Sequence, residues 1–155
     1  MAAEGDASVA GHARVKAIMD TAPTFPRTRL GLRIALGALY LAAGLLHVLR
    51  PHGFELIVPG WVPCPHETVI LTGVAELFGA VGLFVPRVRR WAAIGLAAYA
   101  VAVYPANIKH AVDHVVIDGV ALGYAYHVPR LLFQPVLVWA ALFAGSVIDW
   151  PWRRG

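Results

Sequence analysis

The sequence is short of charged residues, and this deficit argues against a soluble fold. Charged side chains make up 14% of the 155 residues, whereas hydrophobic side chains make up 59%. A soluble domain carries about 25% charged residues, so the imbalance favours an integral membrane protein. The net charge is +4. Because the arginines flank apolar runs, as membrane topology requires, we expect contact with membrane lipids and no nucleic-acid partner.

Cysteine and the common cofactor motifs are also scarce. Cys64 is the single cysteine, which excludes an internal disulfide, a CxxC redox pair and a cysteine-rich metal site. The sequence contains no phosphate-binding glycine loop, dinucleotide fingerprint or nucleophile elbow. Residues 1–28 lack the apolar core of a signal peptide, and we expect a disordered cytoplasmic tail there. We do not expect the chain to be an enzyme on its own.

Long apolar runs dominate the rest of the chain, and each is long enough to cross a bilayer as a helix. The strands of a membrane barrel would be shorter and would alternate in polarity. We therefore predict an all-α fold, a bundle of four transmembrane helices within a membrane domain at 29–149. The predicted helices are 29–49, 67–86, 91–108 and 130–148.

Basic residues predict the orientation of this bundle. They gather before the first run, in the turn at 87–90 and in the C-terminal segment 150–155. Four spans bring these three regions to one side, and the positive-inside rule makes that side cytoplasmic, with both termini inside. The first outer loop is rich in proline, and we expect it to fold back onto the mouth of the bundle.

Glu76 is an ionisable residue near the centre of the second run, close to the expected bilayer midplane. Such a residue is a functional-site hypothesis by default, and we expect it to bind a ligand or exchange a proton. Small residues surround it on one helix face, a pattern typical of close helix packing in lipid. The small residues around Glu76 are Gly73, Gly79 and Ala80. Three other glycines are also expected to pack helices together, namely Gly44, Gly82 and Gly95. The alternative is a protonated Glu76 that hydrogen-bonds a neighbouring helix and only stabilises packing.

Further polar side chains are expected at the outer ends of the other helices. There they would line an outward-facing cavity with Glu76 at its floor, or form a network that ties the helices together. Pro105 lacks an N–H group, so it leaves a helix carbonyl free to accept a hydrogen bond from elsewhere. The predicted lining residues are Tyr40, His47, Tyr104, Asn107, Arg130 and Gln134.

Two histidines suggest a second kind of site. His110 and His114 are four residues apart, so one helical face could hold zinc, copper or haem. Two histidines at a wet helix end are more often ordinary surface residues, and no zincin or haem-attachment motif accompanies them.

Several short motifs, in order, resemble the DoxX family of small four-helix bacterial membrane proteins. They are Gly44-Leu-Leu-His47, Arg50-Pro51-His52-Gly-Phe54, Ile57-Val58-Pro59, Gly73-Val-Ala-Glu76, Pro86-Arg87-Val-Arg89-Arg90, Tyr104-Pro105-Ala106-Asn107 and Pro129-Arg130-Leu-Leu-Phe-Gln134. The resemblance implies a multi-pass protein of the bacterial cytoplasmic membrane. It also implies association with a membrane redox or respiratory complex, since the family is named after a subunit of a quinol oxidase or thiosulfate:quinone oxidoreductase.

Four functional hypotheses follow. The first is an accessory subunit of a redox complex that binds a quinone-like or other amphipathic molecule around Glu76. The second is an assembly protein without a ligand. The third is a binder or isomerase of lipids or sterol-like molecules, although no second catalytic acid is visible inside the bundle. The fourth is a metal or haem site on the outer face.

Overall fold

The computed structural model describes residues 25–117 and 119–151, and this part of the chain is mostly helical. Helix α2 (Pro26–Leu49) begins with a proline, whose missing N–H costs nothing in a first turn. A single turn, α3 (His52–Glu55), follows, and α4 (Pro65–Gly82) again starts with a proline. The tail expected at residues 1–24 and the last four residues of the basic C-terminal segment lie outside the described residues.

The helix predicted at 91–108 is interrupted. Helix α5 (Arg89–Ala102) ends just before Val103, and α6 (Tyr104–Val112) has Pro105 in its first turn. Because Pro105 has no N–H group, the regular hydrogen-bond pattern of α5 cannot continue through it.

The segment between α6 and the last helix, and that helix itself, also differ from the sequence-based expectation. Strands β1 (Val116–Ile117) and β2 (Val120–Ala121) form a short antiparallel hairpin that the all-α prediction did not include. Helix α7 (Tyr124–Ala144) then begins earlier and ends earlier than 130–148, and it contains Pro129 and Pro135. Arg33 Nε donates to the Ala144 carbonyl at 2.9 Å, which satisfies one of the acceptors that the end of α7 leaves free.

Four helices pack in a ring in the order α2, α4, α5, α7 and back to α2. The core is made largely of alanines on α4, α5 and α7, together with Leu36, Leu83 and Leu96. A Cβ added at Gly73 would lie 2.7 Å from His47 Cβ, so α2 and α4 approach as closely as the small residues predicted. The packing role predicted for Gly95 is wrong, since a Cβ there would meet nothing within 4 Å.

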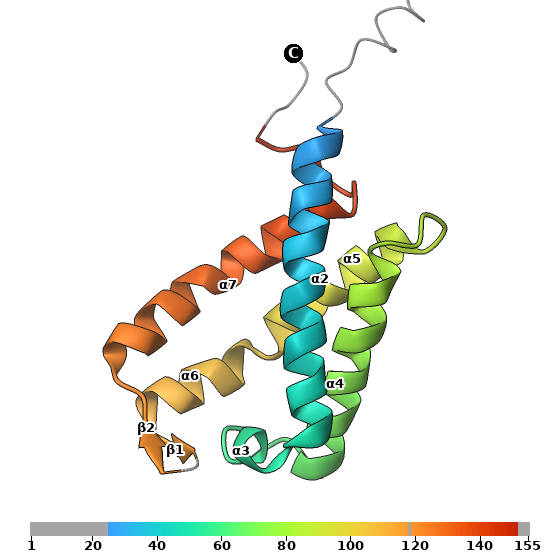
Figure 1. Ribbon diagram of the computed structural model, residues 1–155. Coiled ribbons are helices and arrows are strands. Elements are labelled where there is room, and N and C mark those ends of the chain that lie inside the picture. Colours follow the sequence, from blue (N-terminus) through green and yellow to red (C-terminus); the bar gives the residue numbers. More distant parts are fainter. Residues whose placement is uncertain (1–24, 118, 152–155) are drawn as a thin grey trace, which may run out of the picture.

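The ring is tighter at one end than at the other (Figure 1). The start of α2, the end of α7 and the turn between α4 and α5 lie at one end, while α3 and the hairpin lie at the opposite end. Toward α3 the lower parts of α2 and α7 diverge in the view.

Within the described residues, three helical segments are long and apolar enough to cross a membrane: Pro26–Leu49, Arg89–Val112 and Tyr124–Ala144. The segment Arg89–Val112 joins α5 and α6. Helix α4, which carries Glu67 and Glu76, is not among the three.

Candidate functional site: a cavity inside the helix ring

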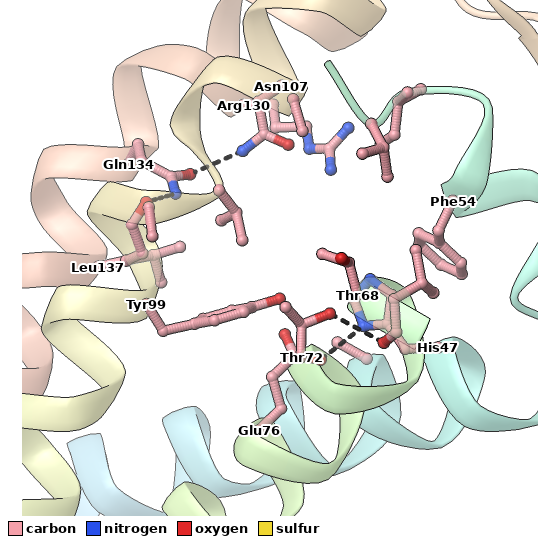
Figure 2. Close-up of a pocket in the computed structure, with 18 of the residues that line it drawn as sticks. His47, Phe54, Thr68, Thr72, Glu76, Tyr99, Asn107, Arg130, Gln134 and Leu137 are labelled. Atoms are coloured by element: carbon pink, nitrogen blue, oxygen red, sulfur yellow. Dashed lines mark hydrogen bonds and ion pairs between the residues drawn. The ribbon is translucent and has the colours of Figure 1, made fainter. Parts of the chain in front are cut away.

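A cavity of about 590 Å³ opens among the helices at the end where they diverge, and all the major helices contribute to its wall. Most of its lining is aliphatic or aromatic, with a few polar side chains at two places (Figure 2). Cavities of about 300–1,000 Å³ with an apolar wall and a few convergent polar groups are typical of small-molecule sites.

Glu76 and His47 form the first polar group of the wall. Nδ1 of His47 and Oε2 of Glu76 lie 2.6 Å apart in a hydrogen bond between α2 and α4. Glu76 is only 3% exposed, which the glycines at its side make possible by bringing the two helices together. The ring of Phe54 lies 4.0 Å from the imidazole, centroid to centroid, and covers it from the side of α3.

Two tyrosines surround this pair. The Tyr99 side chain reaches from α5 toward Glu76 and interacts with its carboxyl group (Figure 2). The rings of Tyr40 and Tyr99 meet edge to face with centroids 6.2 Å apart. Tyr40 is 4% exposed, and its hydroxyl has no hydrogen-bond partner within the described structure. A buried hydroxyl without a partner is costly, so an oxygen or nitrogen of a ligand or a water would stabilise it.

The second polar group lies across the cavity, on α6 and α7 (Figure 2). Asn107 Nδ2 donates to Gln134 Oε1 at 3.2 Å, and Gln134 Nε2 donates to the Ala100 carbonyl. That carbonyl belongs to the last turn of α5, where the break before Pro105 leaves acceptors free. The guanidinium of Arg130 lies beside these amides, and its NH1 group donates to His110 Nδ1 at 3.2 Å.

The proline-rich loop between α2 and α4 covers the cavity. Phe54, Ile57, Val58 and Trp61 all belong to its lining. Lys109 holds this loop against α6, because its Nζ donates to the carbonyls of Leu56 at 2.9 Å and Val58 at 2.7 Å. The expectation that the proline-rich loop folds back onto the bundle is therefore confirmed.

Most of the residues predicted to line a cavity do so. The structure brings together Tyr40, His47, Glu76, Asn107, Arg130 and Gln134. Tyr104 is the exception. It is the first residue of α6, immediately after the break at Val103, and its side chain is not part of the lining. Tyr104 and Asn107 are one turn apart on α6, as expected, but only Asn107 reaches the cavity.

The predicted pair of metal-binding histidines does not form. Helix α6 ends at Val112, and His114 has a positive φ of 48°, so the two histidines do not share one helical face. His110 instead packs on His127, with ring centroids 4.6 Å apart, and accepts from Arg130. In residues 25–117 and 119–151, no three His, Cys, Asp or Glu side chains come together as metal ligands.

Other lining residues were not predicted from the sequence. Thr68 and Thr72 line the cavity together with Glu76, and their spacing of four residues along α4 places all three on one face. This spacing was a signal available in the sequence. Tyr99 had a weaker signal, as a single hydroxyl within the apolar run of α5.

The structure is mostly helical, with three helical segments long and apolar enough to cross a membrane and a cavity inside the ring of helices. The chain belongs to the family described as Domain of unknown function (DUF8561), whose family model matches residues 36–144. The match runs from the middle of α2 to the last residue of α7 and includes every residue of the cavity lining. No curated protein and no solved structure matches the chain.

Proposed function

We propose that the protein is a four-span membrane protein that binds a quinone-like or other amphipathic molecule in its cavity. In this proposal it serves as a DoxX-like accessory subunit of a membrane redox complex. The observation that carries the binding proposal is the composition of the cavity wall. An apolar surface surrounds a buried His47–Glu76 hydrogen bond, and the unpartnered Tyr40 hydroxyl lies close to Glu76.

The fourth span in this proposal is α4. Its 18 residues correspond to roughly 27 Å of helix, close to the thickness of a hydrocarbon core. Helix α4 packs closely alongside α2 at Gly44 and Gly73. This contact supports the proposal that α4 crosses the bilayer next to α2. The basic residues at the start of α2 and in the turn between α4 and α5, which lie at the same end of the ring (Figure 1), support a cytoplasmic location for that end. The cavity then opens toward the outer side.

Glu76 has the central role. An acid that shares a hydrogen bond with a histidine can take up or release a proton as a bound molecule is reduced or oxidised. Tyr99 and Tyr40 would hold the polar part of the ligand near this pair. The DoxX resemblance supports the assignment to a redox complex, and the cavity itself supports only the binding of an amphipathic molecule.

The test begins with gentle purification of the full-length protein in a mild detergent. Mass spectrometry of the intact assembly should detect partner subunits and a bound amphipathic molecule. Substitution Glu76→Gln keeps the shape of the side chain but removes its ionisation. It should abolish proton-coupled activity of the complex while leaving assembly intact. A wild-type protein that carries neither partner nor ligand would overturn the proposal, and unchanged activity in Glu76→Gln would exclude an ionisable role.

A further inference from the structure

Arg130 carries a positive charge into the cavity wall, and no carboxylate of the described residues pairs with it. Among the described residues, the carboxylate groups within 4 Å of a basic side chain pair with Arg29, His47, His52 and His66, and none pairs with Arg130. Its recorded contacts are the hydrogen bond to His110 Nδ1 at 3.2 Å and the ring of Tyr126, 5.7 Å from the guanidinium carbon. Because a guanidinium only donates, the imidazole nitrogen must accept. Neither contact supplies a negative charge.

The position of Arg130 makes this imbalance costly. Arg130 is half-buried and lies in α7, one of the three helical segments long and apolar enough to cross a membrane, where an unbalanced cation is expensive. Glu76 is already hydrogen-bonded to His47, and the two lie on opposite sides of the cavity from Arg130 (Figure 2). An anion brought in by a ligand would remove the cost. The planar fork of an arginine binds a carboxylate or a phosphate through two parallel hydrogen bonds.

The rest of the wall fits an apolar chain attached to such an anion. Leu39 on α2 and Phe133 on α7 both line the cavity, yet they are 46% and 53% exposed. The cavity therefore reaches the outer surface of the ring between these two helices, which diverge in this region (Figure 1). A hydrocarbon tail can pass through this opening into the lipid while its head stays inside.

We propose that the cavity binds an amphiphile with an anionic head, a carboxylate or a phosphate, which pairs with Arg130. The tail lies along the apolar wall and leaves between α2 and α7. This inference rests on the proposed function of the cavity and specifies the charge of its ligand. It distinguishes the ligand from an uncharged quinone, which has no group to neutralise Arg130.

Trp61 offers a direct measurement, because it lines the cavity at its mouth and is 75% exposed. The probes are a brominated stearic acid, which quenches nearby tryptophans, and its uncharged methyl ester. Full-length protein in a neutral detergent is titrated with each probe at a pH that ionises the acid. Trp61→Phe identifies the part of the quenching that comes from the cavity. The acid should quench Trp61 saturably, and the ester should need at least about a tenfold higher concentration, as expected for loss of a charge-assisted hydrogen bond.

Variants then test whether the preference for the acid over the ester depends on Arg130. Arg130→Gln should weaken binding of the acid by about tenfold or more and leave the ester unchanged, whereas Arg130→Lys should retain an intermediate affinity. Arg50→Gln is the matched control, because Arg50 is exposed and lies outside the cavity lining. Competition by a lysophosphatidic acid, compared with inorganic phosphate alone, shows whether a phosphate head is accepted and whether the tail is required.

The outcomes separate this inference from the proposed function. Equal affinity of the wild-type protein for acid and ester would overturn the anionic head, even if Arg130→Gln fails to fold. If a short-chain quinone quenches Trp61 saturably and the acid does not, the cavity proposal stands and the inference fails. If acid, ester and quinone all fail to quench Trp61, both proposals fall.

Discussion

His47 and Glu76 are 29 residues apart in the sequence, yet their side chains meet at 2.6 Å inside the helix ring. The contact depends on Gly44 and Gly73, which lie one turn before each of these residues on α2 and α4. The Gly73 carbonyl would lie 2.7 Å from a Cβ at position 44, so any larger residue there would push the helices apart. The hydrogen bond at the centre of the site is therefore a product of backbone packing.

The first prediction concerns the energy of this hydrogen bond. His47→Ala should lower the free energy of unfolding by roughly 1–3 kcal/mol, because the buried Glu76 loses its partner. In a double-mutant cycle with Glu76→Gln, the two substitutions should show a coupling energy of about 0.5–3 kcal/mol. Equilibrium unfolding in mixed micelles gives all four values. Strict additivity would mean that the contact contributes nothing to stability.

The second prediction tests the approach of α2 and α4. Gly73→Ala should destabilise the protein by about 1–3 kcal/mol, because the new Cβ overlaps His47 Cβ and forces the helices to separate. Gly95→Ala is the matched control on α5, where a Cβ meets nothing within 4 Å. It should stabilise the helix by up to about 1 kcal/mol. Thermal unfolding measures the stability of both variants. An equal change in stability for Gly73→Ala and Gly95→Ala would contradict the close packing of α2 on α4 at Gly73.

The third prediction concerns the loop that covers the cavity. Lys109→Met removes the two hydrogen bonds to the Leu56 and Val58 carbonyls. Amide exchange in residues 51–64 should then become about five- to tenfold faster, since the loop opens more often. Hydrogen-exchange mass spectrometry measures this directly. Arg50→Met provides a control in which an exposed positive charge is lost nearby, and its loop should exchange at the wild-type rate.

The fourth prediction concerns the opposite end of the ring. Arg29 is 8% exposed, donates to the Phe143 carbonyl and pairs with Asp149, and its guanidinium lies 4.3 Å from the Phe143 ring centre. Arg29→Met should cost roughly 2–3 kcal/mol, because the carbonyl at the end of α7 loses a charged donor. Arg27 is exposed two residues earlier, and Arg27→Met should change the unfolding free energy by less than about 0.5 kcal/mol. If both variants lost a similar amount of unfolding free energy, the loss of one positive charge would explain the effect, and the contacts of Arg29 would not.

Much of the candidate site was predictable because it depends on local chemistry. A carboxyl group in an apolar run has to turn toward the interior, so Glu76 was expected to be buried and it is. Gln134 donates to the Ala100 carbonyl in the last turn of α5, whereas the acceptor expected from the missing N–H of Pro105 is the Val101 carbonyl, four residues before it. Tyr104 and the His110–His114 pair were predicted incorrectly. The histidine pair would need α6 to continue to His114, but the helix ends at Val112. Tyr104 lies in α6 with Asn107, yet it is not part of the cavity lining.

The sequence by itself determined the apolar helices, the small residues between α2 and α4, and the polar side chains that apolar surroundings would force inward. These features follow from the composition and spacing of nearby residues. Only the tertiary structure decided which polar groups meet. Helix packing and the path of the loops join His47 to Glu76 and bring Lys109 to the loop that covers the cavity. Within the described residues they also leave Arg130 without a carboxylate partner. Contacts between residues far apart in the chain depend on how helices tilt and where they break, and these depend on the summed packing of the whole ring.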